Sequence, residues 1–198
     1  MRFKQYALAF FIITILPFIS CNNNNSISSA DTTSAIKKDT AKEESIDTTS
    51  NIVGDTIVNL IKRSLLSTLV KNDLSTLTDN DRRFVYSTID LNDDGKQEIF
   101  VGMKGSYFCG NAGCTVFLLN SEAKQITMFS IVDGPITVIN EKSNGWKQLI
   151  IPSRGINYLV KFDGKKYPSN PSVQSKFNGS LPTNAVTVLD DNLKEQTF

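Results

Sequence analysis

The sequence predicts an α+β protein: an antiparallel β-sheet meander with one N-terminal amphipathic helix packed on it. Between residues 84 and 162, short runs rich in β-branched and aromatic residues alternate with turn sequences such as Asn144-Gly145 and Asp163-Gly164. The segments between the runs are short, which favours antiparallel neighbours. Ahead of these runs, residues 57–70 carry apolar side chains at helical spacing, which predicts the helix.

The first 20 residues are expected to be a lipoprotein signal peptide. Arg2 and Lys4 precede an uncharged apolar run from Tyr6 to Ile19. A membrane-spanning helix needs about 20 apolar residues, so this run is short for a span and fits the apolar region of a signal peptide.

Cys21 stands directly after this run, in the sequence Phe18-Ile19-Ser20-Cys21. This sequence resembles the bacterial lipobox, although Phe18 stands where leucine is usual. The resemblance implies that Cys21 becomes lipidated, for example with palmitate, and holds the protein on a membrane of the cell envelope. Asn22 rather than Asp after the cysteine implies the outer membrane. The alternative is an ordinary secretory signal with a chance cysteine.

Residues 21–54 are predicted to be the lipidated cysteine and a disordered tether, because residues 22–54 hold few large apolar residues and many Ser, Thr, Asn and charged residues. A single globular domain, residues 55–198, is expected to follow. Its helix is predicted to begin at Asp55 as N-cap and to end near Asn72. Thr78 and Asp81 then have the spacing of a capping box, which predicts a short helical turn before the first strand.

An acidic loop separates the first two predicted strands, residues 84–89 and 98–103. It reads D-x-N-x-D-G-x-x-E, so oxygen-bearing side chains recur at the spacing of calcium loops, and Gly95 permits a sharp turn. An EF-hand is excluded, because its twelfth position is Val101 instead of glutamate and strands flank the loop. A plain hairpin turn is the alternative. The candidate metal ligands are Asp90, Asn92, Asp94, the backbone carbonyl of Lys96, and Glu98.

The acidic loop resembles the strand-loop-strand calcium loops of FG-GAP and VCBS-type repeats, whose pattern is D-x-[DN]-x-D-G-x-x-[DE]. The resemblance covers about a dozen residues and implies calcium as the cofactor. There are two departures: those families repeat the loop, which occurs once here, and the ninth position is Glu98 where aspartate is usual. An isolated site of this kind is expected to bind calcium with a dissociation constant on the order of 10⁻⁴ M.

Cys109 and Cys114 flank a short loop that contains two glycines. In an exported protein, two cysteines this close are predicted to form a disulfide bond. A redox role would use C-x-x-C spacing, and a zinc site would need further ligands nearby. With Cys21 lipidated, no cysteine would remain free.

The rest of the domain is predicted to continue the meander. The expected strands are residues 115–119, 125–132, 136–140, 146–151 and 157–162, with turns at 133–135, 144–145 and 163–164. Pro168, Pro171 and Pro182 favour an extended tail along the surface, with one further edge strand at residues 185–189.

The composition excludes several classes of function. The chain contains no histidine, which rules out His-based triads and His-ligated zinc or haem. Its net charge is +1, and becomes −1 without the first 20 residues, which hold two basic and no acidic residues. Nucleic-acid binding needs a concentrated basic surface, so no nucleic-acid partner is expected.

The order of these elements resembles uncharacterised envelope lipoproteins of Gram-negative bacteria, in which a calcium-type loop often precedes a C-x4-C loop. This implies a lipid-anchored protein that faces the periplasm or the cell surface. We expect a non-catalytic binding or scaffold module, with an envelope protein or a glycan as partner. Five aromatic residues either line a glycan-binding surface or belong to the core: Tyr107, Phe108, Trp146, Tyr158 and Tyr167.

Two alternative functions remain open at this stage. The first is a periplasmic inhibitor of an envelope-degrading enzyme such as lysozyme, acting through residues 105–114. The second is a carboxylate-based hydrolase, in which Asp90, Asp94 and Glu98 would supply the acid and the base. In the hydrolase, these carboxylates would act as catalytic groups and not as calcium ligands. Their spacing fits calcium ligands better, so the chain is not expected to be an enzyme.

Overall fold

The structure, a computed structural model, describes residues 48–198, with side chains from residue 56 onward. The predicted signal peptide, the lipidation site Cys21 and residues 22–47 of the predicted tether lie outside the described residues. Within the described part of the chain, no helix combines the length and the apolar character that crossing a membrane requires.

The helix α1 (Thr48–Ser64) begins seven residues before the predicted N-cap, so Asp55 lies inside it and residues 48–54 are helical. The polar composition of residues 48–54 argues against a packed core in this segment. A helix nevertheless forms its backbone hydrogen bonds within its own segment, so it can extend through polar residues. After Ser64 the helix widens into a π-helical turn, η1 (Leu65–Leu69), which the N–H of Val70 closes by donating to the Leu65 carbonyl at 3.1 Å.

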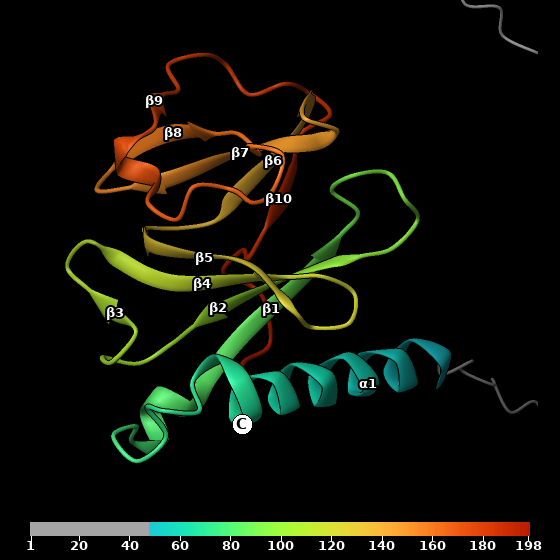
Figure 1. Cartoon of the computed structure of the whole chain (residues 1–198), viewed down its shortest axis with the longest axis vertical. Coiled ribbons are helices and arrows are strands. Elements are labelled where there is room, and N and C mark those ends of the chain that lie inside the picture. Colours follow the sequence, from blue (N-terminus) through green and yellow to red (C-terminus); the bar gives the residue numbers. More distant parts are fainter. Residues whose placement is uncertain (1–47) are drawn as a thin grey trace, which may run out of the picture. The chain divides into compact units, whose positions relative to one another are not determined.

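Eleven strands in the described residues form two antiparallel sheets, shown in Figure 1. The first sheet has the order β11-β1-β2-β4-β3, with β5 paired to β4, and the second has the order β10-β6-β7-β8-β9. The first sheet contains β1 (Arg83–Ile89), β2 (Glu98–Met103), β3 (Cys109–Gly110), β4 (Gly113–Leu119), β5 (Gln125–Val132) and β11 (Gln196–Thr197). The second contains β6 (Ile136–Ser143), β7 (Trp146–Ser153), β8 (Ile156–Val160), β9 (Ser175–Lys176) and β10 (Val186–Val188).

The prediction of a mostly antiparallel β fold with one helix is confirmed, but the prediction of one continuous sheet is wrong. The strands β5 and β6 do not pair, and the chain passes from one sheet to the other at residues 133–135. Pro135 has no N–H to donate, and the N–H of Asp133 already bonds to the Pro152 carbonyl of the second sheet at 2.9 Å. The predicted turn at this point is therefore a crossing between sheets and not a hairpin.

The first sheet has a core on each of its faces. Side chains alternate along β2, so that Ile99, Val101 and Met103 pack against the helix side while Phe100 packs into the core between the sheets. Figure 1 shows the same arrangement, with α1 beneath the first sheet and the second sheet above it. Glu98 is on the same face of β2 as Phe100, and it therefore points toward the second sheet.

The short 3₁₀ helix η2 (Asp79–Arg82) confirms the predicted capping box. Asp81 Oδ2 accepts hydrogen bonds from the N–H of Thr78 at 3.0 Å and from the Thr78 hydroxyl at 2.6 Å. Its other oxygen accepts from the N–H of Tyr107 at 3.0 Å, which ties this turn to the segment before Cys109. The Thr78 and Tyr107 hydrogen bonds lower the pKa of Asp81.

We expect Asp81→Ala to lower the melting temperature by several degrees and to speed amide exchange in residues 105–109. The substitution removes the capping hydrogen bonds and leaves the N–H of Tyr107 without its acceptor. Because folding lowers the pKa of Asp81, this stabilisation is present above about pH 4 and is lost as the pH falls further. Thermal unfolding and hydrogen-exchange mass spectrometry measure both effects. Exposed Asp79 is the matched control; equal losses in Asp79→Ala would contradict the assignment.

Candidate metal site and adjoining cleft

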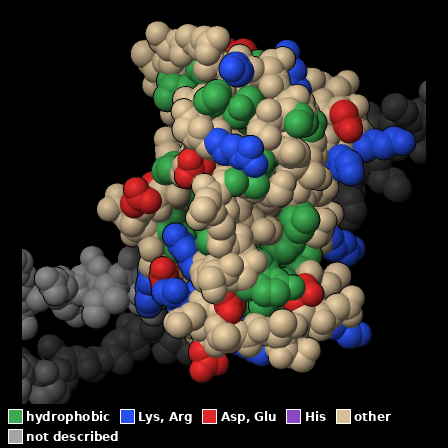
Figure 2. Space-filling model, turned by 90° about the vertical axis from the view of Figure 1, so that its left-hand side faces the viewer, with side chains coloured by type: hydrophobic (Ala, Val, Ile, Leu, Met, Phe, Trp, Pro, Cys, Tyr) green, Lys and Arg blue, Asp and Glu red, His purple; other side chains and the backbone are tan. Residues whose placement is uncertain are grey.

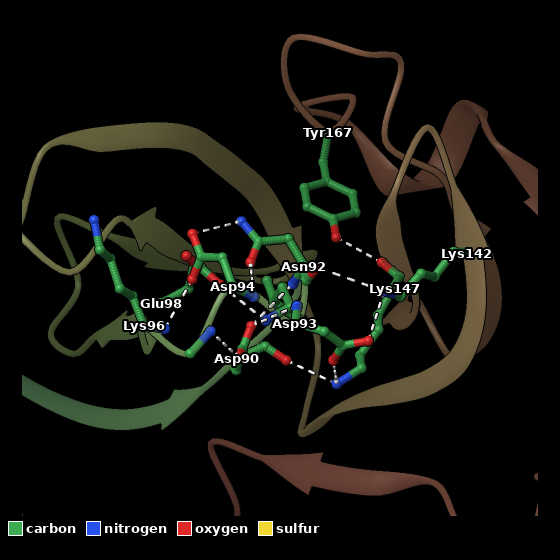
Figure 3. Close-up of polar contacts among 11 residues, drawn as sticks. Asp90, Asn92, Asp93, Asp94, Lys96, Glu98, Lys142, Lys147 and Tyr167 are labelled. Carbon is green, nitrogen blue, oxygen red and sulfur yellow. Dashed lines mark hydrogen bonds and ion pairs between the residues drawn. The ribbon is translucent and has the colours of Figure 1, made fainter. Parts of the chain in front are cut away.

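The acidic loop between β1 and β2 is folded by hydrogen bonds from its own backbone to its side chains, drawn in Figure 3. Asp90 Oδ2 accepts from the N–H of Gly95 at 2.9 Å, and Asn92 Oδ1 accepts from the N–H of Asp94 at 3.0 Å. Asp94 Oδ1 accepts from the N–H of Lys96 at 2.8 Å. These turns bring alternate side chains to the inside of the loop, as either a calcium loop or a plain turn requires.

Gly95 has φ +82°, the left-handed conformation that its place in the motif predicts. A Cβ at this position would meet nothing within 4 Å, so the backbone angle and not crowding calls for glycine. Asp93 is also left-handed, with φ +61°, a conformation that aspartate tolerates better than most residues.

Glu98 is the buried member of the predicted ligand set, with 3 % of its surface exposed. Its Oε2 accepts a hydrogen bond from the N–H of Leu91 at 2.8 Å. Burial raises the pKa of Glu98, and the negative charges of Asp94 and Asp90 raise it further. Burial also opposes ionisation of Asp90, but the N–H groups that point at its carboxylate outweigh this effect and lower its pKa. The loop thus places three carboxylates within electrostatic range of one another.

Asp93, which the sequence pattern did not single out, attaches the loop to the second sheet. Its carboxylate forms ion pairs with Lys142 Nζ of β6 at 2.5 Å and with Lys147 Nζ of β7 at 2.8 Å. The hydrogen bonds from Lys142 and Lys147 lower the pKa of Asp93 to about 2. In Figure 3 this carboxylate points away from those of Asp94 and Glu98.

Lys147 makes two further connections between the loop and the second sheet. Its Nζ donates to the Asp90 carbonyl at 2.9 Å, and its backbone N–H donates to the Leu91 carbonyl at 2.8 Å. Tyr167, fully buried, donates its hydroxyl proton to the Lys147 carbonyl at 2.5 Å. Sequence reasoning missed Lys142 and Lys147 because they follow the loop by about 50 positions and belong to no local motif.

The donor set of the loop fits a hard cation. Calcium takes about six to eight oxygen ligands, and the loop supplies three carboxylates, the Asn92 amide and the Lys96 carbonyl, with lone pairs beyond those used by the backbone N–H groups. Asp93 engages Lys142 and Lys147, so these cations do not sit among the candidate ligands. Among the described residues, however, no group of three or more Asp, Glu, His or Cys side chains is already gathered closely enough to hold a metal ion.

The predicted disulfide between Cys109 and Cys114 is confirmed. It joins β3 to β4 at directly opposite positions, and Gly110 pairs with Gly113, so that Asn111 and Ala112 form the tip of a tight hairpin. Tyr107 and Phe108 precede it with their rings in edge contact at 5.0 Å, and 47 % of the Tyr107 surface is exposed. The disulfide therefore holds a narrow loop with an exposed aromatic residue at its base.

A cleft of about 400 Å³ adjoins the acidic loop. One wall is the loop itself, a second is the turn between β4 and β5, and the third comes from the second sheet. Trp146 and Phe162 contribute to this third wall, with their rings stacked at 4.6 Å and 12°. The lining residues include Asn92, Asp94, Glu98, Ser121, Gln125 and Trp146.

The five aromatic residues proposed from the sequence do not form one surface. Trp146 lines the cleft, whereas Tyr158 and Tyr167 belong to the core, with 7 % and 0 % of their surfaces exposed. Tyr107 and Phe108 lie beside the disulfide hairpin. Figure 2 shows one face of the domain, on which basic and acidic side chains are interspersed and apolar side chains reach the surface in several places, with the larger group in the lower half.

No protein-family model, curated protein or solved structure matches this chain.

Proposed function

We propose that this protein is a lipid-anchored cell-envelope protein whose β-rich domain is a calcium-stabilised, non-catalytic binding module. Cys21 would carry the lipid and Asn22 would direct the protein to the outer membrane, as the lipobox resemblance implies. The disulfide between Cys109 and Cys114 supports this location, because disulfides persist in oxidising compartments outside the cytoplasm.

The observation that carries the calcium proposal is buried Glu98 beside Asp90 and Asp94. A hairpin turn explains the Asx hydrogen bonds of the loop, and Glu98 accepts one hydrogen bond from the N–H of Leu91. That single bond does not offset the burial of Glu98 and the negative charges of Asp94 and Asp90, which together raise its pKa. A divalent cation would offset both the desolvation of Glu98 and the repulsion among the three groups. The arrangement therefore favours an ion site over a plain turn.

The position of the loop supports a structural role for the ion. The loop connects β1 and β2 of the first sheet, and the ion pairs of Asp93 with Lys142 and Lys147 attach it to the second sheet. The same loop forms one wall of the cleft. An ion held there would stabilise the contact between the sheets together with the cleft, so binding of a partner would depend on calcium.

We expect calcium to raise the melting temperature of the purified full chain by several degrees. With a dissociation constant on the order of 10⁻⁴ M, millimolar calcium would add about 1.5–2.5 kcal/mol to the free energy of unfolding. Calorimetry in EGTA, in 5 mM calcium (~50 times the expected dissociation constant) and in equimolar magnesium measures the effect. Absence of a calcium-selective rise would overturn the proposal.

Two substitutions test whether Asp90 is an ion ligand or only a residue that stabilises a turn. Asp90→Ala should abolish the response to calcium. Asp163→Ala is the matched control, because Asp163 Oδ1 accepts from the N–H groups of Lys165 and Lys166 at 2.8 and 2.9 Å in another turn. This control should lower the starting stability and keep the full calcium response.

One observation favours inhibition of an envelope-degrading enzyme as a second candidate function. Tyr107 is exposed at the base of a hairpin held by a disulfide, and a preorganised loop of this kind loses little entropy on entering a cleft. Inhibition of lysozyme that weakens at least tenfold in Tyr107→Ala would support this function. Lysozyme activity unchanged by micromolar protein would rule it out.

A further inference from the structure

We infer that the cleft beside the acidic loop binds a neutral saccharide unit, with Trp146 as its stacking platform. The inference deepens the proposed function, since it names the ligand class of the binding module and rests on that role. Three observations support it: the aromatic wall, the polar groups that line the same cleft, and the balance of charges around the cleft.

The aromatic wall is rigid. Trp146 stacks on Phe162 in a parallel arrangement at 4.6 Å, and Tyr167 contacts both rings edge-on, at 6.2 Å from Trp146 and 5.2 Å from Phe162. Trp146 is only partly buried, whereas Phe162 and Tyr167 are core residues. A partly exposed indole that is already held by its neighbours is suited to the apolar C–H face of a pyranose ring. It offers a flat apolar surface, and its side chain loses little conformational entropy when the sugar binds.

Polar side chains complete the cleft. Ser121 and Gln125 line it, and within the described residues neither side chain has a hydrogen-bond partner. Asn92 and buried Glu98 line it from the acidic loop. Amides, hydroxyls and carboxylates together offer the donors and acceptors that bind sugar hydroxyl groups.

The charges around the cleft favour an uncharged ligand. Acidic Asp94, Glu98 and Glu122 share the lining with basic Lys96 and Lys165, so neither sign dominates. Glu122 is also neutralised by an ion pair with Lys124 at 2.7 Å. Strong binding of a phosphate or an amine would need a cluster of one sign.

The volume also limits the ligand. A cleft of about 400 Å³ lies at the lower end of small-molecule sites, which run from about 300 to 1,000 Å³. It accommodates one or two sugar rings and not a protein segment with side chains. The ligand class is therefore a monosaccharide or disaccharide unit, free or at the end of a glycan.

Trp146 is the single tryptophan of the chain, so intrinsic fluorescence reports on the cleft directly. The full chain in 5 mM calcium (~50 times the expected dissociation constant) is titrated with cellobiose, lactose and N,N′-diacetylchitobiose. Glucose 6-phosphate and glucosamine serve as charged probes. We expect at least one neutral disaccharide to shift the Trp146 emission with a dissociation constant below about 1 mM, the weak end of specific affinities.

Variants test which groups bind the sugar, with affinity measured by calorimetry. Gln125→Ala, at an exposed position, should weaken binding at least threefold with an unchanged melting temperature, and Trp146→Ala at least tenfold. Tyr107→Ala is the control for a nonspecific aromatic contact and should have no effect. An equal loss in Tyr107→Ala would overturn the inference.

The outcomes separate this inference from the proposed function. If no neutral disaccharide shifts the emission up to about 10 mM, or if only a charged probe does, the saccharide site is wrong while the calcium response can still stand. If a disaccharide binds but calcium leaves the stability unchanged, the calcium proposal fails and the saccharide site is retained.

Discussion

In EGTA at neutral pH, Glu98→Gln should be more stable than the wild-type protein by about 1 kcal/mol, and in millimolar calcium this order should reverse. Glutamine keeps an oxygen that can accept from the N–H of Leu91 and removes a buried charge beside Asp90 and Asp94. If the loop binds calcium as proposed, the wild type should gain stability from the ion, whereas the variant would lack one ligand and should gain little. Melting temperatures measured in both buffers test the reversal.

The pH dependence provides an independent check on the Glu98 prediction. Folding raises the pKa of Glu98, so its ionisation costs stability only as the pH rises above about 4.5, the ordinary value for glutamate. The advantage of Glu98→Gln in EGTA should therefore disappear below that pH. Glu122→Gln is the matched control, because Glu122 lines the same cleft with 65 % of its side chain exposed. A Glu98→Gln variant that is less stable than wild type in EGTA would contradict the prediction.

Lys147→Met should lower the free energy of unfolding by about 2 kcal/mol. The substitution removes a charged hydrogen bond to the Asp90 carbonyl and one of the two ion pairs of Asp93, while methionine fills much of the same space. Only 17 % of the Lys147 side chain is exposed, so water replaces these contacts poorly. Chemical denaturation measures the loss, and calcium titration should show weaker binding because the loop is no longer held to β7.

Lys142→Met is the control that distinguishes loss of the Lys147 contacts between the loop and the second sheet from loss of one positive charge beside Asp93. Both lysines pair with Asp93, but 35 % of the Lys142 side chain is exposed and its contact with the Asn92 carbonyl is long, at 3.4 Å. Exposed ion pairs contribute little, so this variant should lose less than about 1 kcal/mol. Equal losses in the two variants would show that the Asp90 carbonyl contact does not hold the sheets together.

Much of the local structure could be predicted, because it depends on residues close together in the chain. The predicted strands at 98–103 and 125–132 agree with β2 and β5, and the capping box at Thr78 is present. The division into two sheets could not be predicted. Residues 133–135 have the composition of a turn whether the next strand pairs with β5 or crosses to another sheet, and long-range packing decides between the two.

The candidate site shows the same contrast between local features, which could be predicted, and long-range contacts, which could not. Asp90 and Glu98 were found because nine consecutive residues contain the whole ligand pattern. Asp93 was missed because its partners Lys142 and Lys147 come from the second sheet. Trp146 was one of five aromatic candidates, and only the fold distinguished it from Tyr167, which is fully buried.

By itself, the sequence determined the candidate ligands of the acidic loop, the pairing of Cys109 with Cys114 and the antiparallel character of the strands. Each of these follows from spacing and residue type within a short segment. Only the tertiary structure decided that Glu98 is buried, that Lys147 joins the loop to the second sheet, and that Trp146 faces a cleft. Burial and electrostatic environment arise from residues that packing brings together, and a linear pattern does not contain them.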